Sequence, residues 1–312
     1  MSNFSLSIIA PAYNEEENIN TFYEKIKDIL DRATPNWEIV FINDGSSDNT
    51  LNIIRDLAKV DRRIKYLSFS RNFGKEIALT AGLDYADCEA VIPIDTDLQD
   101  PPELILEMVK HWQDGNDVVY AKRKVREGET FFKLLTASMF YKLMANMSDI
   151  DIPENVGDFR LLDKKVVKEL RRLKEKNRFM KGIFSWVGFK NKEILFERKK
   201  RDAGTTKFNF LRLWHFAIDG ITSFSMFPLR IFLYSGSAIM FLSFIYALVI
   251  VFKTIFIGKD LAGYPSIMVT ILFFGGMNMF AIGVIGEYLG RVYEEVKNRP
   301  LYIVSESNLD KI

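Results

Sequence analysis

Apolar and polar positions alternate in blocks along the first part of the chain. Short, nearly continuous apolar runs are typical of strands buried on both faces, and they occupy residues 6–10, 37–42, 64–69 and 90–94. Between these runs, apolar residues recur at helical spacing, as at Ile19, Phe22, Ile26 and Ile29. Because strand alternates with helix, the strands are expected to be parallel and joined by right-handed crossovers. The pattern therefore predicts a layered α/β sheet, continued by a helix over 102–112 and a strand over 118–120.

The pattern changes near residue 130, where aromatic and basic residues begin to share segments with helical spacing. Two such segments lie near 130–148 and 208–224. Helices with an apolar aromatic face and scattered cations are typical of the lipid headgroup plane, so both are expected to be amphipathic interfacial helices. The alternative is that both pack on the sheet as ordinary core helices.

Two long apolar stretches, 231–252 and 264–285, follow this region. A helix needs about 20 residues to cross a hydrocarbon core of about 30 Å, so we expect two transmembrane helices; a buried hairpin in a soluble domain is the alternative. Glu287 is costly if it faces lipid, and we expect it to meet Arg291 or the membrane interface. Four glycines would permit close helix contacts, within the chain or between subunits of a homo-oligomer. They are Gly275, Gly276, Gly283 and Gly286.

The distribution of charge predicts the orientation in the membrane. A net charge of +1 argues against a nucleic-acid-binding protein, which would carry a strongly basic face. Cations crowd both ends of the apolar pair, whereas the connection 253–263 holds only Lys253 and Lys259. The positive-inside rule then places both termini and the α/β domain in the cytoplasm, at the plasma (inner) membrane. The single cysteine, Cys88, is in keeping with a reducing compartment.

These patterns divide the chain into three regions. Residues 1–226 are expected to form the cytoplasmic α/β domain, including the interfacial helices, and residues 227–290 the transmembrane pair. Residues 291–312 would be a cytoplasmic tail, and its end, 305–312, resembles frayed polar chain.

Polar clusters follow each of the first four predicted strands, in residues 11–15, 43–48, 70–75 and 95–100. In an open parallel sheet, ligands bind beyond the carboxyl ends of the strands, so the four loops are expected to meet at one site. Taken alone, each cluster could be turn or helix-capping chemistry. Four clusters at one edge of the sheet favour a binding site.

Asp95-Thr96-Asp97 is the sharpest element of this edge. In an extended segment, residues two apart point the same way, so both carboxylates can face one ligand. Two carboxylates about 4 Å apart repel by roughly 4 kcal/mol at an effective dielectric constant of 20, and a bound cation removes this repulsion. Mg²⁺ or Mn²⁺ combines a few carboxylate oxygens with phosphate oxygens and water. The pattern predicts a metal that joins Asp95, Asp97 and the amide of Gln99 to a diphosphate.

Longer motifs resemble a known family. Pro-Ala-Tyr-Asn-Glu-Glu at 11–16, Asn-Asp-Gly-Ser-Ser-Asp at 43–48, Ser-Arg-Asn-Phe-Gly-Lys at 70–75 and Asp-Thr-Asp-Leu-Gln-Asp at 95–100 are similar to family 2 inverting glycosyltransferases. Gly157–Asp163, Arg178–Gly182, Ala203–Lys207 and Phe227–Arg230 resemble the subgroup that acts on polyprenyl phosphates, namely bactoprenol glucosyltransferases and dolichol-phosphate mannose synthases. The processive polysaccharide synthases of the family differ, because no Gln-x-x-Arg-Trp follows Asp158.

The resemblance implies a GT-A nucleotide-sugar-binding fold and a role for individual residues. Asp158 corresponds to the catalytic aspartate, the alternative being a carboxylate at a strand start that pairs with Arg160 or caps a turn. Asp95, Asp97 and Gln99 would hold Mg²⁺ or Mn²⁺. The residues implied in nucleotide binding are Pro11, Tyr13, Asn14, Glu15, Asp44, Lys75 and Thr96.

The implied reaction is inverting transfer of one sugar, glucose from UDP-glucose, to undecaprenyl phosphate. A phosphate acceptor needs cations beside so many carboxylates, and the candidates are Arg123, Arg126, Arg201 and Lys207. These could also be ordinary basic residues near anionic lipid. Two alternatives stay open for the function: a dolichol-phosphate-mannose type of synthase using GDP-mannose, and a non-catalytic membrane scaffold with the same fold.

Overall fold

The structure is a computed structural model, and it describes residues 3–124, 153, 156–176, 178–197 and 263–309, with scattered positions between 232 and 256. Several predictions lie outside the described residues. These are the interfacial helices, most of the first apolar stretch, the domain boundary at 226, and the acceptor candidates Arg126, Arg201 and Lys207.

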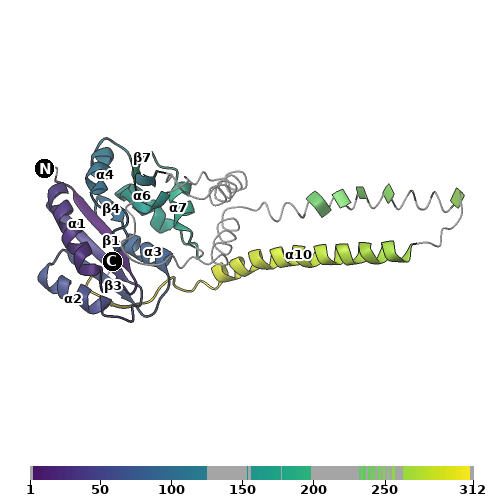
Figure 1. Cartoon of the computed structure of the whole chain (residues 1–312), viewed down its shortest axis with the longest axis horizontal. Helices are drawn as coiled ribbons and strands as arrows, with labels where there is room; N and C mark the ends of the chain where they lie inside the picture. Colours follow the sequence, from purple (N-terminus) through teal and green to yellow (C-terminus); the bar gives the residue numbers. More distant parts are fainter. Residues whose placement is uncertain are drawn as a thin grey trace.

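A single eight-stranded sheet forms the centre of the α/β domain (Figure 1). Its order is β7-β5-β6-β4-β1-β2-β3-β8, and only β6 and β8 run antiparallel to their neighbours. The strands are β1 (Ser5–Ala12), β2 (Asn36–Asn43), β3 (Ile64–Phe69), β4 (Ala90–Pro93), β5 (Val118–Arg123), β6 (Val156–Asp163), β7 (Asn191–Phe196) and β8 (Val304–Ser307). The predicted layered α/β sheet is therefore confirmed.

Helices cover both faces of this sheet and form two cores. On one face the apolar stripes of α1, α2 and α4 pack on Leu6, Ile8 and Phe41. On the other face α3, α6 and α7 pack on Ile9 and Ile42. The helices are α1 (Ile19–Ala33), α2 (Thr50–Val60), α3 (Lys75–Tyr85), α4 (Leu104–Gln113), α6 (Lys164–Arg172), α7 (Met180–Trp186) and α10 (Tyr264–Val296).

Helix α3 packs directly against the sheet. Residues Ala78–Leu83 are all buried, so this helix has no polar face over its middle turns. A Cβ on Gly82 would lie 2.2 Å from Cγ2 of Ile9, so only glycine permits this approach. The close packing fixes the amino end of α3, which begins at Lys75, against the carboxyl ends of the central strands.

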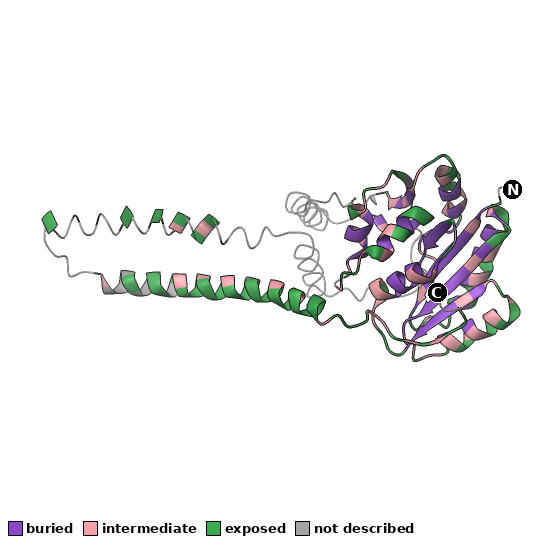
Figure 2. Cartoon of the chain, turned by 180° about the vertical axis from the view of Figure 1, so that it is seen from behind, coloured by how far each residue is buried: buried purple, intermediate pink, exposed green. Residues whose placement is uncertain are grey.

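Helix α10 leaves the α/β domain and extends far from it (Figure 1). It has 33 residues, a length of about 50 Å at the α-helical rise. Large apolar side chains are exposed along it, among them Ile271, Phe280 and Leu289 (Figure 2). The predicted contact between Glu287 and Arg291 is confirmed at 3.0 Å.

Within the part of the chain that the structure describes, no helix meets the combined requirements of length and hydropathy for a membrane span.

After α10 the chain returns to the sheet, and the prediction of a frayed end is wrong. Strand β8 pairs with β3, and the Tyr302 ring stacks on Phe69 with ring centroids 5.1 Å apart. Glu306 forms an ion pair with Arg55 and accepts a hydrogen bond of 2.6 Å from the Tyr66 hydroxyl. The segment is polar, so its sequence alone does not indicate a strand. It forms one because it pairs with the edge of β3 and contacts side chains distant in sequence.

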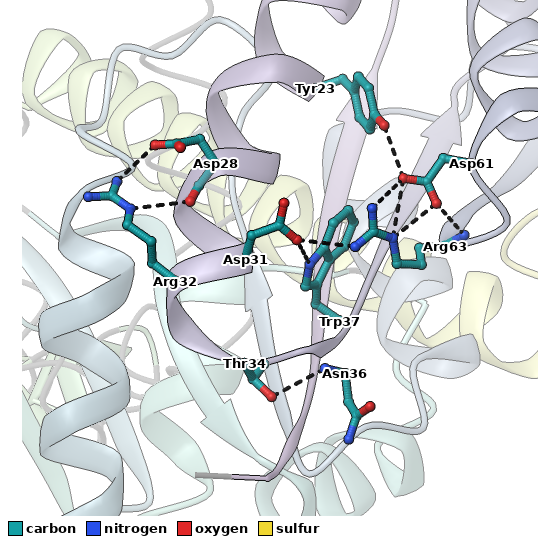
Figure 3. Close-up of polar contacts among 9 residues, drawn as sticks. All are labelled: Tyr23, Asp28, Asp31, Arg32, Thr34, Asn36, Trp37, Asp61 and Arg63. Atoms are coloured by element: carbon teal, nitrogen blue, oxygen red, sulfur yellow. Dashed lines mark hydrogen bonds and ion pairs between the residues drawn. The ribbon is translucent and has the colours of Figure 1, made fainter. Parts of the chain in front are cut away.

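A polar cluster ties α1 to the entry of β3 (Figure 3). Asp61 accepts hydrogen bonds from Arg63, at 2.8 Å from Nη2, and from the Tyr23 hydroxyl at 3.0 Å. The Arg63 guanidinium lies 3.7 Å from the centre of the Trp37 ring, and Trp37 donates to Asp31. The hydrogen bonds from Arg63 lower the pKa of Asp61 to about 2 from its ordinary 3.8.

We expect Asp61→Asn to lower the free energy of unfolding by roughly 2 kcal/mol near neutral pH, the equivalent of this pKa difference. Because the pKa is lower in the folded chain, the stabilisation is complete above the unfolded pKa and disappears as the pH falls from about 4 to about 2. Chemical unfolding of the full chain at several pH values measures the effect. Asp28→Asn is the control, since Asp28 is 76% exposed and pairs only with Arg32 in Figure 3. An equal loss in both variants would contradict the assignment.

Candidate active site

A cavity of about 380 Å³ opens at the carboxyl ends of β1, β2 and β4, beside the start of α3. Eight of the predicted site residues line it: Pro11, Tyr13, Glu15, Asp44, Lys75, Asp95, Thr96 and Asp97. Four segments distant in sequence therefore meet at one place, as the strand-end argument expects. The lining also includes Asn72, Gly74 and Ala78, which the motifs did not single out for a role.

Asn14, a predicted nucleotide ligand, joins two of the loops instead of lining the cavity. Its backbone lies in the left-handed region, with φ of 55°. Its side-chain oxygen accepts from the Ser47 N–H at 2.9 Å, and its own N–H donates to Ser46 Oγ at 3.0 Å. Asn14 thus fixes the first loop against the second.

Asp44 lies at the cavity and holds the third loop. Its two carboxylate oxygens accept from the backbone N–H groups of Phe73 at 2.7 Å and Gly74 at 2.9 Å. Burial raises the pKa of Asp44, although these hydrogen bonds oppose the shift. Beside it, Gly45 has φ of 65°, and a Cβ there would lie 2.3 Å from the Arg71 carbonyl carbon. The two loops therefore touch backbone to backbone, which only glycine allows.

The predicted metal ligands divide into two groups. Asp95 and Asp97 both line the cavity. Gln99 lies outside the lining, and its backbone N–H donates to Asp97 Oδ1 at 3.1 Å. Among the described residues, no three acidic, histidine or cysteine side chains form a cage for an ion. Two carboxylates fit Mg²⁺ nevertheless, because this ion is usually held by one or two carboxylates and completed by substrate phosphates and water.

Lys75 joins the cavity to the predicted catalytic aspartate. Its ammonium lies 2.7 Å from Asp95 Oδ1, 2.8 Å from Asp95 Oδ2 and 2.8 Å from Asp158 Oδ2. Burial alone would lower the pKa of Lys75, but the charges of Asp95 and Asp158 outweigh it and raise this pKa. The lysine therefore remains charged and neutralises part of the repulsion between the two carboxylates.

Asp158 is the third residue of β6 and only 13% of its side chain is exposed. Burial would raise its pKa, but Lys75, and then Arg160 and Lys181, lower it, so the carboxylate stays ionised. The alternative contact with Arg160 is not formed: the Nη2 of Arg160 donates to the Gly157 carbonyl at 2.7 Å. Asp158 Oδ1 is buried and has no hydrogen-bond partner among the described residues. Within the described part of the chain, this oxygen is therefore an unpaired acceptor that is shielded from solvent.

Sequence reasoning missed two groups beside Asp158. Glu76 follows Lys75 on α3, and its carboxylate accepts the backbone N–H of Met180 at 3.1 Å, which fixes the start of α7. Burial and the charge of Asp158 raise the pKa of Glu76 to about 7. Lys181 follows Met180 on α7, and its charge acts on the carboxylates of Asp158 and Glu76. The motif Arg178–Gly182 was the available signal, but its contacts come from elements distant in sequence.

Arg123 is the one acceptor candidate within the described residues. Its Nη2 lies 3.2 Å from Asp100 Oδ1, and a Cβ on Gly157 would be 3.4 Å away from the same nitrogen. Arg123 therefore lies next to the residue that precedes Asp158. The positive charge of Arg123 is partly neutralised by its ion pair with Asp100.

Comparison with known proteins agrees with this arrangement of fold and site. The model of glycosyl transferase family 2 matches residues 7–171, more than half of the chain. The chain belongs to glycosyltransferase family 2, and it is a glycosyltransferase. A second model, described as the GtrB C-terminal hairpin, matches residues 227–292.

Curated relatives extend the similarity over nearly the full chain. The SfII prophage-derived bactoprenol glucosyl transferase of Shigella flexneri is 49% identical over 303 residues, which are 97% of this chain and 98% of the relative. An uncharacterized glycosyltransferase of Synechocystis is 54% identical over 96% of this chain and 95% of its own length. The predicted family is thus confirmed.

Solved structures are more distant. A glucosyl-3-phosphoglycerate synthase from Mycobacterium tuberculosis aligns with 70% of this chain and 78% of its own, at 18% identity and a TM-score of 0.46. A likeness at this level adds nothing to what the family model shows.

We expect Asp44→Asn to lower the free energy of unfolding by about 1–3 kcal/mol, because an amide nitrogen cannot accept one of the two loop N–H groups, which stays buried and unpaired. Chemical unfolding of the full chain measures the loss. Asp56→Asn is the control, since Asp56 is 73% exposed on α2. Unchanged stability in Asp44→Asn would show that the loop does not depend on this carboxylate.

Proposed function

We propose that this chain transfers one glucose from UDP-glucose to undecaprenyl phosphate, with inversion, at the cytoplasmic face of the plasma membrane. The names of the relatives support this acceptor and sugar: several are bactoprenol glucosyl transferases 48–49% identical over 96–97% of the chain. The observation that carries the proposal is the Lys75 bridge. The Lys75 ammonium contacts Asp95, which lines the cavity together with Asp97, and it also contacts the buried carboxylate of Asp158.

The donor end of the site belongs to Asp95 and Asp97. These carboxylates would hold Mg²⁺ or Mn²⁺, with Gln99 able to join after a rearrangement of its side chain. A divalent metal bound there supplies Lewis-acid neutralisation of the departing diphosphate. The rest of the lining, from Pro11 and Tyr13 to Thr96, would surround the nucleotide.

Asp158 acts on the sugar as an anion. A prenyl phosphate is already negatively charged at neutral pH, so no proton has to be removed from the nucleophile. The lowered pKa of Asp158 suits a group that stays ionised, orients the sugar and stabilises positive charge at the anomeric carbon. Attack opposite the diphosphate turns an α-linked donor into a β-linked lipid product.

The acceptor phosphate needs cations because it would otherwise meet Asp95, Asp97 and Asp158. Arg123 stands beside Gly157 and is suitably placed to contribute one. Arg126, Arg201 and Lys207 are proposed for the same role from the sequence alone. Arginine suits bidentate contact with phosphate oxygens, while lysine acts as a point charge.

The membrane location rests on the hairpin and on α10. The exposed apolar side chains of α10, among them Ile271 and Phe280, form a surface that lipid would cover. Strand β8, which follows α10, pairs with β3 of the α/β domain. Two crossings of the bilayer would return the chain to the side of the α/β domain, where β8 lies. The proposal therefore has two transmembrane helices, with both termini on the side of the active site.

We expect membranes containing the protein to move label from UDP-glucose, and not from GDP-mannose, into the lipid fraction. Asp158→Asn should lower kcat by roughly 100-fold or more at every pH, because the negative charge at the sugar is lost. Asp87→Asn, exposed at 70% on its side chain and paired with Lys164, should match the wild type. Label from GDP-mannose would favour the mannose alternative, and no transfer from any donor the scaffold.

Removal of the divalent metal should abolish transfer, and added Mg²⁺ or Mn²⁺ should restore it. Asp97→Ala should abolish transfer at all metal concentrations, while the amount of protein in the membrane stays unchanged. Transfer rates with chelator, and metal titrations of the two proteins, measure this. Undiminished transfer in chelator would refute the metal assignment.

A further inference from the structure

The ammonium of Lys75 lies among three carboxylate oxygens. Two carboxylate oxygens of Asp95 and one of Asp158 surround it at 2.7–2.8 Å. One of these carboxylates lines the donor cavity, and the other is the proposed catalytic group. A single side chain therefore bridges the two ends of the site.

The base of this lysine is fixed, while its side chain is partly exposed. Gly74, which precedes it, has φ of 99°, and both its N–H and that of Phe73 are held by Asp44. The Lys75 side chain, in contrast, is 46% exposed, and it ends on a flexible four-carbon stem. The ammonium can change partners without any movement of the backbone.

A divalent cation on Asp95 would compete with this ammonium. Both oxygens of Asp95 already contact Lys75, and a second cation on the same carboxylate would repel the first. A diphosphate in the cavity removes the conflict, because it brings negative oxygens to a place that Lys75 also lines. Asp158 cannot follow such a change, since it is buried on β6.

We propose that Lys75 is a positioning residue that exchanges partners when the donor binds. Before binding it holds Asp95 and Asp158 together. When metal and diphosphate enter, it releases Asp95 to the metal, turns toward the diphosphate and keeps its contact with Asp158. The inference rests on the proposed metal and nucleotide sites, but not on the identity of the sugar or the acceptor.

The exchange predicts a thermodynamic coupling between metal and nucleotide. Lys75 opposes binding of the metal alone and favours binding of the metal together with diphosphate. UDP should therefore strengthen Mn²⁺ binding, and Mn²⁺ should strengthen UDP binding by the same factor. This coupling should depend on the positive charge at position 75. A lysine that only stabilises the fold would leave the coupling unchanged.

The test measures Mn²⁺ binding to the full chain by electron paramagnetic resonance, with and without UDP, in the wild type, Lys75→Met, Lys75→Arg and Lys59→Met. In Lys75→Met, Mn²⁺ alone should bind more tightly, by about threefold or more, and the strengthening by UDP should fall by about fivefold or more. Lys75→Arg should retain most of the coupling. Lys59, 74% exposed on α2, should give wild-type values when replaced.

The enzymatic parameters separate positioning from nucleotide binding. Loss of the contact with Asp158 should lower kcat of Lys75→Met at saturating donor, whereas a residue that only binds nucleotide would change KM alone. The proposal is overturned if Lys75→Met binds Mn²⁺ alone more weakly, if it keeps the full effect of UDP, or if the wild type binds no Mn²⁺. If the couplings are as expected but no sugar reaches lipid, the proposed function fails and this inference stands.

Discussion

One ammonium group between two carboxylates is the interaction on which the site depends. Asp95 follows the buried central strand β4, and Asp158 belongs to β6, which runs the other way, so the fold brings two negative charges to the same place. At about 4 Å, two such charges repel by roughly 4 kcal/mol even at an effective dielectric constant of 20. Lys75 offsets this repulsion, and its positive charge keeps Asp158 ionised.

The position of Lys75 follows from helix packing and from hydrogen bonds that hold the preceding loop. Gly82 lets α3 lie against Ile9, and Asp44 holds the two N–H groups that precede the helix. Glu76, the next residue, fixes the start of α7. Residues that motif reasoning assigns to nucleotide binding, such as Asp44 and Asn14, therefore also build the loops. Their substitution would change the site through the backbone as well as through lost ligand contacts.

The two antiparallel strands connect this site to the rest of the chain. Strand β6 adds Asp158 to a sheet whose other rim residues follow parallel strands. Strand β8 brings the end of α10 to the opposite edge, beside β3. With the hairpin in a membrane, the active site would be held near the lipid surface by both ends of the hairpin, which suits an acceptor with a phosphate at the interface and a chain in the bilayer.

The sequence by itself determined the order of strands and helices in the first half, the four rim loops and the family, because periodicity and strand-end motifs are local patterns. It placed Asp95, Asp97 and Lys75 at one site for the same reason. It did not determine β8, whose polar residues become a strand only against β3, nor that Gln99 lies outside the lining of the cavity. Only the tertiary structure decided that Lys75, and not Arg160, meets Asp158, and that Glu76 lies beside them. Those contacts join α3, β4, β6 and α7, and a charge has no partner until folding brings such distant segments together.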